Sequence, residues 1–172
     1  MKNKKILNLI LIFSGVLTLI ICSVMNFIFI PEIESGTGGL RAFDMTFGYT
    51  YQQAKQFVSL LSPQGLDVYL HKQLPLDFLY PIVYTVFFVS VFMKLKVKHK
   101  AVYALPALLF VSDYCENILS VIMLTSSFSR VVSSFACAFT ILKTITMYSI
   151  FAAFIILIIM RSVKKKQSAG KC

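Results

Sequence analysis

Four ionisable residues and one amide lie in segments that are otherwise apolar enough to cross a lipid bilayer. This set, the polar cluster, consists of Asp77, Asp113, Glu116, Asn117 and Lys143. Carboxylate and ammonium groups are costly inside a membrane, where they usually face a charged partner or a wet cavity. Asp113 and Glu116 are one helical turn apart, so they could act as proton donor and acceptor. The polar cluster is therefore the candidate ligand-binding site.

The charge balance of the cluster leaves two interpretations open. Three carboxylates against one lysine leave an excess of two negative charges, so one or two carboxyls should be protonated or neutralised by a bound cation. In a structural role, Lys143 pairs with Glu116 or Asp113, and Asn117 bridges two helices. In a functional role, the same residues line an outward-facing cavity that binds a ligand, a proton or a cation.

The depth of these residues can be counted from the basic residues at the helix ends, using a rise of about 1.5 Å per residue. Asp77, Glu116 and Lys143 each lie about 24–27 Å from those ends, and Asp113 lies near 20 Å. Asp77, Glu116 and Lys143 are therefore expected to share one layer, and Asp113 lies about one helical turn deeper. We expect Lys143 to lie within ion-pair distance of Glu116 or Asp113.

Two prolines flank Asp77 in the chain. Pro75 precedes it and Pro81 follows it. A proline inside a helix supplies no N–H and displaces the carbonyl four residues earlier, so both can bend the helix. We expect free backbone carbonyl groups near the layer that holds the cluster.

Composition and hydropathy predict an all-α membrane protein. Of the 172 residues, 58% are hydrophobic and 14% are charged, with a mean hydropathy of +0.79, which excludes an ordinary soluble domain. A cleaved signal peptide is the competing interpretation of the first apolar run, but its length and the absence of a small-residue cleavage pattern favour a retained helix. A single domain with a four-transmembrane-helix bundle follows, its spans at residues 6–30, 76–93, 101–124 and 131–160.

The basic residues predict the orientation of the bundle. Twelve of the seventeen lysines and arginines lie before the first span, between the second and third, or in the tail at residues 161–172. Four lie in the other connections. The positive-inside rule then places both termini in the cytoplasm, for a multi-pass protein of the plasma membrane. The charge is explained by topology, so we expect the lipid bilayer as partner and no nucleic acid.

The outer loop, residues 31–75, is predicted to carry an amphipathic helix between the first two spans. An apolar stripe recurs at helical spacing between residues 47 and 61, with Asp44 as the expected N-cap. The opposite face is rich in glutamine rather than strongly basic, so we expect the helix to cover the mouth of the bundle as a lid. The stripe consists of Phe47, Tyr51, Ala54, Val58 and Leu61.

Other chemistry finds little support in the sequence. No C-x-x-C pair is present, which argues against a thiol-disulfide oxidoreductase. His71 and His99 lie on opposite sides of the membrane in the predicted topology, and no His/Cys spacing resembles a ligand set. We therefore expect no metal and no cofactor.

Two motifs carry a resemblance to known proteins. The pattern from Leu76 to Tyr84, LDFLYPxxY, and Asp113-x-x-Glu116-Asn117 resemble an uncharacterised family of small four-helix integral membrane proteins of bacteria. That likeness spans residues 43–124 and implies topology rather than an activity. The architecture is also similar to the EXPERA superfamily of sterol isomerases and the sigma-2 receptor. No histidine lies in a predicted span here, so only ligand binding in an acid-lined cavity carries over.

These observations favour a non-enzymatic membrane protein that binds an apolar or amphiphilic small molecule, or a cation, at the polar cluster. One alternative is a membrane-embedded enzyme that uses Asp113 and Glu116 as acid and base on a lipid-like substrate, although a nucleophile and oxyanion donors are not visible. Another is an accessory or immunity-type protein that acts through a membrane-protein partner.

Overall fold

The computed structural model describes residues 2–126 and 128–169, and the regular structure in these residues is helical throughout. Four helices are long and apolar enough to cross a membrane, which confirms the predicted fold class. The first combines α1 (Lys2–Val24), a π-helical turn (Met25–Phe29) and α2 (Ile30–Glu34). The second combines α4 (Pro63–Val68), a π-helical turn (Tyr69–Gln73) and α5 (Leu74–Lys94). The third and fourth are α6 (Ala104–Thr125) and α7 (Arg130–Ala169).

The first two long helices continue past prolines at which the sequence predicts a boundary. Pro31 and Pro75 each stand two residues after a π-helical turn, and both are accommodated without ending the helix. A π turn widens the backbone, so the carbonyl that would clash with the proline ring is displaced. The second helix consequently starts at Pro63 instead of residue 76, where the Ser62 hydroxyl accepts a hydrogen bond from the N–H of Gly65 at 3.0 Å.

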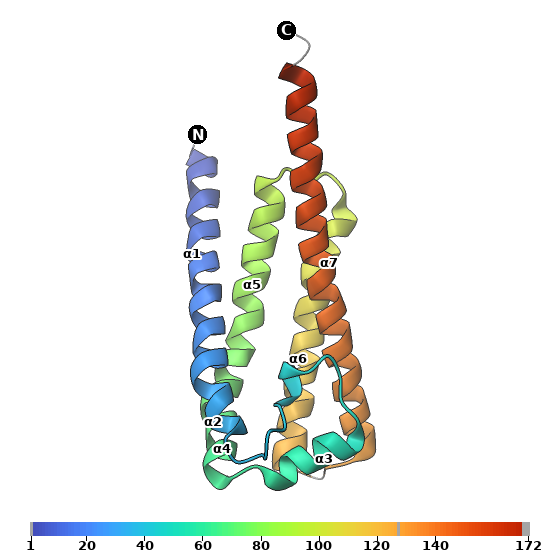
Figure 1. Ribbon diagram of the computed structural model, residues 1–172. Helices are drawn as coiled ribbons and strands as arrows, with labels where there is room; N and C mark the ends of the chain where they lie inside the picture. Colours follow the sequence, from blue (N-terminus) through green and yellow to red (C-terminus); the bar gives the residue numbers. More distant parts are fainter. Residues whose placement is uncertain (1, 127, 170–172) are drawn as a thin grey trace.

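The four long helices form a bent row that is open between α1 and α7, because α7 also packs on α5 through the rings of Phe154, Phe88 and Phe92. α1 packs on α5, α5 packs on α6, and α6 packs on α7 (Figure 1). Gly15 allows α1 to approach α5 closely, because a Cβ atom there would lie 3.0 Å from the ring of Phe87. The two outermost helices, α1 and α7, therefore flank an opening instead of closing the bundle.

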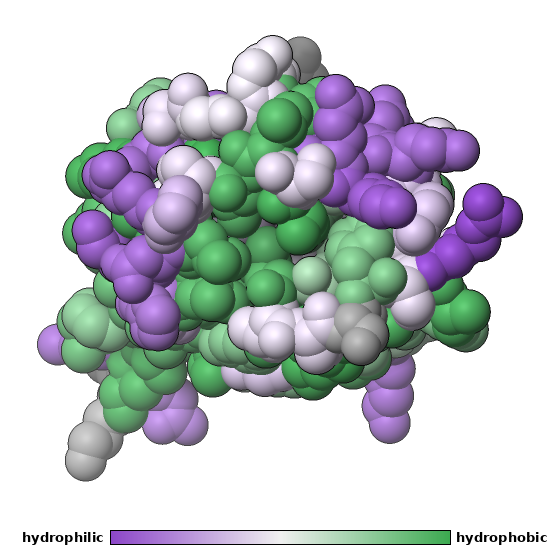
Figure 2. Space-filling model, turned by 90° about the horizontal axis from the view of Figure 1, so that it is seen from below, coloured by the Kyte–Doolittle hydropathy of each residue, from purple (hydrophilic) through white to green (hydrophobic). Residues whose placement is uncertain are grey.

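The two ends of the bundle differ in charge and in shape. The start of α1, the end of α7 and the connection between α5 and α6 lie at one end (Figure 1). This basic end carries Lys4, Lys5, Lys94, Lys96, Lys98, Lys100 and Arg161. The opposite end carries α3 (Tyr51–Leu60) and the loops around it. Figure 2 shows that end face-on, with hydrophobic residues in the middle of the surface and hydrophilic residues on its two sides.

α3 covers the bundle as expected for a lid, with most of the expected face turned inward, but it starts later than expected and its buried face includes Phe57 and not Phe47. Thr50 caps the helix and forms a capping box with Gln53, so the expected N-cap at Asp44 is wrong. A short 3-10 turn (Phe43–Met45) and extended residues precede it. Because Phe47 lies in this non-helical segment, it does not share the helix face and is 60% exposed.

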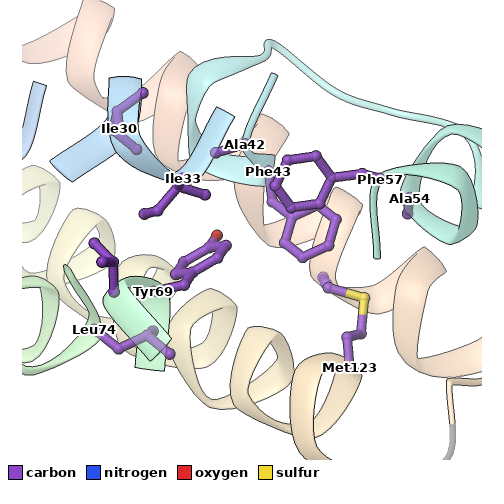
Figure 3. Close-up of a cluster of buried hydrophobic side chains, with 11 residues drawn as sticks. Ile30, Ile33, Ala42, Phe43, Ala54, Phe57, Tyr69, Leu74 and Met123 are labelled. Carbon is purple, nitrogen blue, oxygen red and sulfur yellow. The ribbon is translucent and has the colours of Figure 1, made fainter. Parts of the chain in front are cut away.

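The buried face of α3 presents Ala54 to the core, as expected, together with Phe57, and Val58 and Leu61 of the predicted stripe pack against the same core. Phe57 is 2% exposed and packs against the ring of Phe43, with centroids 5.0 Å apart. Figure 3 shows this cluster, in which side chains from α2, α3 and the second and third long helices meet beneath the lid. The lid is therefore held by a hydrophobic core and is part of the folded domain.

Candidate functional site

Lys143 on α7 joins the two acidic residues of α6. Its Nζ lies 3.2 Å from Oδ1 of Asp113 and also forms an ion pair with Oε2 of Glu116. Asp113 is 3% exposed and Glu116 is 1% exposed. The expected ion pair is present, and both carboxylates share one ammonium group in a site that water barely reaches.

Each carboxylate is held by a second donor that the sequence analysis did not assign to the polar cluster. The hydroxyl of Tyr84 on α5 donates to Oδ2 of Asp113 at 2.8 Å. The hydroxyl of Thr140 on α7 donates to Oε1 of Glu116 at 2.6 Å. Both hydroxyl residues lie on the face that presents their helix to the cluster, since Thr140 is three residues before Lys143 and Tyr84 is seven after Asp77. That periodicity is the signal that could have found them.

Asn117 bridges helices α6 and α5 through a carbonyl that lacks its usual partner. Its Nδ2 donates to the backbone oxygen of Asp77 at 2.8 Å. In a regular helix that oxygen accepts from the N–H four residues later, but that residue is Pro81, which has none. One residue further on, the Tyr114 hydroxyl donates to the carbonyl of Phe78 at 2.8 Å. The carbonyl that Pro81 is predicted to release from the helix thus accepts a hydrogen bond from Asn117 on the neighbouring helix.

A cavity of about 370 Å³ opens beside this network, and three of the five predicted site residues line it. Asp77, Asp113 and Lys143 line it, whereas Glu116 and Asn117 are not among its lining residues. We call it the acidic cavity. Its remaining walls are mostly apolar, aromatic or weakly polar and come from α1, the loop after α2, α5 and α7: Cys22, Met25, Asn26, Met45, Tyr80, Tyr84, Thr144, Met147, Tyr148 and Phe151.

The acidic cavity lies on the open side of the helix row. Its walls come from both α1 and α7, the two helices that flank the opening. Tyr148 is 65% exposed and Phe151 is 49% exposed, so the α7 wall reaches the outer surface of the bundle.

A neighbouring cavity leads from the same place toward the loop-bearing end. It has a volume of about 500 Å³ and shares Cys22, Asn26 and Met45 with the acidic cavity. Glu34 and Arg41 line its other part. The two cavities therefore adjoin each other along the first long helix, with Glu34 and Arg41 lining one and Asp77, Asp113 and Lys143 lining the other.

The loop before α3 reaches into the bundle beside Glu116. The backbone N–H of Tyr49 donates to Sγ of Cys137 on α7 at 3.3 Å. Burial raises the pKa of the Tyr49 phenol above its usual value of 10, and the negative charge of Glu116 raises it further. The phenol therefore stays neutral at physiological pH and adds no charge to the cluster.

Metal binding gains no support from the described residues, in which no group of three or more His, Cys, Asp or Glu side chains could hold an ion. The chain matches no protein-family model, no curated protein and no solved structure in the three comparisons made with it. The resemblances inferred from its motifs thus remain predictions.

Proposed function

We propose that this chain is a non-enzymatic multi-pass membrane protein that binds an amphiphilic small molecule in the acidic cavity. The observation that carries the proposal is the composition of this cavity. It joins Asp77, Asp113 and Lys143 to walls of methionine and aromatic side chains. A cavity with apolar walls and a few placed polar groups is typical of small-molecule sites.

The charge of the cluster favours a ligand with a cationic head. Asp77, Asp113 and Glu116 contribute three formal negative charges, and Lys143 contributes one positive charge, which leaves −2. An ammonium group at the cavity would reduce this excess, whereas a carboxylate or phosphate would increase it. The apolar part of the ligand would then lie against Met147 and Phe151, toward the lipid-facing opening.

The proposed orientation follows from the basic end. We place the chain in the plasma membrane of a bacterial cell, with both termini and the α5–α6 connection in the cytoplasm. The reason is that short cytoplasmic loops of membrane proteins carry an excess of lysine and arginine. α3 then lies outside. In this orientation the acidic cavity is closer to the outer surface, and Arg41 lines the cavity that adjoins it.

The acid–base alternative is less well supported by the geometry. A proton relay between Asp113 and Glu116 would need both carboxyls at the substrate, but Glu116 does not line the acidic cavity. Its two oxygens are held by Thr140 and Lys143. These contacts favour a supporting role for Glu116.

The proposal can be tested with three probes that share one alkyl chain. Dodecylamine, dodecanol and dodecanoate are added to the detergent-purified protein, and the shift in thermal unfolding temperature is measured. Dodecylamine should stabilise the protein most, because only its head is cationic. Asp77→Asn should reduce this preference for the amine.

A steric variant separates binding in the cavity from binding elsewhere. Met147→Trp should fill the apolar wall and reduce stabilisation by dodecylamine and dodecanol alike, whereas Leu108→Trp, on an exposed position of α6, should respond like the unmodified protein. Equal effects of the amine and the alcohol would refute the cationic head. An unchanged response of Met147→Trp would refute the cavity as the site.

A further inference from the structure

Lys143 contacts two carboxylates, and only one of them lines the acidic cavity. Its Nζ lies 3.2 Å from Oδ1 of Asp113 and also forms an ion pair with Glu116. Asp113 and Lys143 line the cavity, whereas Glu116 is 1% exposed and is not among its lining residues. A ligand with a cationic head would therefore meet Asp113 with a cation of the protein already bound to it.

The two acids lie at different depths, and this determines which of them Lys143 can follow. α6 starts at the basic end of the bundle, so Glu116 lies one helical turn nearer the loop-bearing end than Asp113 (Figure 1). α7 starts at the loop-bearing end, and Thr140, one turn before Lys143, donates to Glu116. The Cα–Cβ bonds of a helix tilt toward its N-terminus. The Lys143 side chain therefore leans toward the depth of Glu116.

We propose that the ligand is a primary ammonium amphiphile that replaces Lys143 at Asp113, while Lys143 keeps its ion pair with Glu116. This exchange of cations rests on the proposed function and defines the ligand class more narrowly. Asp113 then has the ligand at Oδ1 and the hydroxyl of Tyr84 at Oδ2, where that hydroxyl donates at 2.8 Å. Glu116 retains Lys143 and the hydroxyl of Thr140. Glu116 is thus a positioning residue, because it holds Lys143 without touching the ligand.

The exchange requires a cationic head that donates hydrogen bonds. Asp113 is 3% exposed, so an oxygen that lost Lys143 without gaining another donor would be left unpaired where water barely reaches, which is costly. A primary ammonium group has three N–H donors, like Lys143. A trimethylammonium head has the same charge but no donor. Recognition by aromatic rings alone would favour the opposite order, because quaternary ammonium groups bind well to aromatic faces.

The alkyl chain of such a ligand fits the part of the cavity nearer the basic end. Met147 and Phe151 follow Lys143 by four and eight residues, so they lie on the same side of α7. Both line the acidic cavity. A chain packed against these side chains brings its ammonium group to Asp113 from the side that Lys143 leaves when it follows Glu116.

The test compares two double variants of the full-length protein in detergent, and the dissociation constant of dodecylamine is measured by native mass spectrometry. Glu116→Gln with Lys143→Met keeps Asp113 and removes the competing lysine, so it should bind dodecylamine more tightly than the unmodified protein does. Asp113→Asn with Lys143→Met keeps Glu116, which does not line the cavity. It should bind dodecylamine about tenfold more weakly than the first double variant, or weaker still.

The two double variants are matched in charge, since each loses one carboxylate and one ammonium group. Attraction through space is therefore the same in both, and only the position of the remaining acid differs. Equal affinities of the two double variants would overturn the exchange. So would weaker binding by Glu116→Gln with Lys143→Met than by the unmodified protein, because the lysine would then assist the ligand and not compete with it.

A second measurement needs no variant. Dodecylamine should bind to the unmodified protein about tenfold more tightly than dodecyltrimethylammonium, which cannot donate a hydrogen bond to Asp113. Equal affinities, or tighter binding of the quaternary head, would overturn the exchange. The proposed function is tested separately, by dodecylamine against dodecanol. A preference for the amine over the alcohol, combined with equal affinities of the two double variants, would refute the exchange alone.

Discussion

Lys143 and Asp113 are thirty residues apart in the chain, yet the ammonium nitrogen lies 3.2 Å from the carboxylate oxygen. The same ammonium group also contacts Glu116, so one cation on α7 holds both acids of α6. The hydroxyl of Tyr84 donates a hydrogen bond to Asp113, and the hydroxyl of Thr140 donates one to Glu116. The network therefore ties α5, α6 and α7 together at the depth of the acidic cavity.

Replacing Lys143 with methionine should destabilise the protein by about 3–5 kcal/mol, because two buried carboxylates lose the cation that they share. The measurement is the free energy of unfolding in detergent. Combining Lys143→Met with Glu116→Gln should recover part of the loss, since the double variant leaves one fewer buried charge. Strict additivity of the two changes would mean that they do not interact, contrary to the observed ion pair.

Tyr84→Phe should cost about 1–3 kcal/mol of stability. The change removes the hydroxyl that donates to Asp113 at 2.8 Å and leaves a buried carboxylate oxygen without that donor. Tyr148→Phe is the matched control, because this tyrosine is 65% exposed on the lipid-facing side of α7. Similar unfolding temperatures for the two variants would argue against an energetic role for the Tyr84 hydrogen bond.

The Lys143 ion pair was within reach of sequence analysis because its position depends mainly on depth. Counting residues from the helix ends gives depth directly, and it puts Lys143 and Glu116 in one layer with Asp113 about one helical turn away. The rotation of each helix about its own axis, which decides the residues that face inward, is harder to predict from the sequence. Tyr84 and Thr140 belong to the network because their helices turn them inward, and that rotation is set by packing between helices.

The errors in the outer loop have a local origin. The apolar spacing at positions 47, 51, 54, 58 and 61 fits a single helix, but the capping box at Thr50 starts the helix at Tyr51. Phe47 is therefore outside the helix and Phe57 takes the buried position. Likewise, proline usually marks a helix boundary, but a preceding π turn at Tyr69–Gln73 removes the clash and allows the helix to continue through Pro75.

Phe57→Ala should loosen the lid, because it removes a large side chain from the core between α3 and the bundle. A loss of about 3–5 kcal/mol is typical for such a truncation. Hydrogen exchange of residues 51–60 should accelerate in the variant. Phe47→Ala, at a position 60% exposed, should leave exchange unchanged. Faster exchange in Phe47→Ala than in Phe57→Ala would instead support Phe47 as the residue that holds the lid.

The orientation is tested by cysteine labelling in a background in which the four native cysteines are replaced by serine. Ser35→Cys lies at the end of α2, and His99→Cys lies in the connection between α5 and α6. In intact cells an impermeant maleimide should label position 35 and not position 99. Labelling of position 99 alone would mean that the bundle has the opposite orientation in the membrane, so that the acidic cavity lies closer to the cytoplasmic side.

The hydrogen bond from Asn117 to the Asp77 carbonyl should depend on Pro81. Asn117→Ala removes the side-chain donor, and Pro81 has no N–H that could donate to the Asp77 carbonyl in its place. The change should therefore lower the free energy of unfolding by about 1–3 kcal/mol. In a Pro81→Ala background the N–H of the new alanine can donate to that carbonyl within the helix. The same Asn117→Ala change should then cost much less.

The coupling between positions 117 and 81 is measured by unfolding the two single variants and the double variant in detergent. Ser112, also buried on α6, donates only within its own helix to the carbonyl of Leu108, which makes Ser112→Ala a suitable control. Its cost should be the same with proline or alanine at position 81. If Asn117→Ala also costs the same in both backgrounds, then the amide does not act as the substitute for the missing backbone donor.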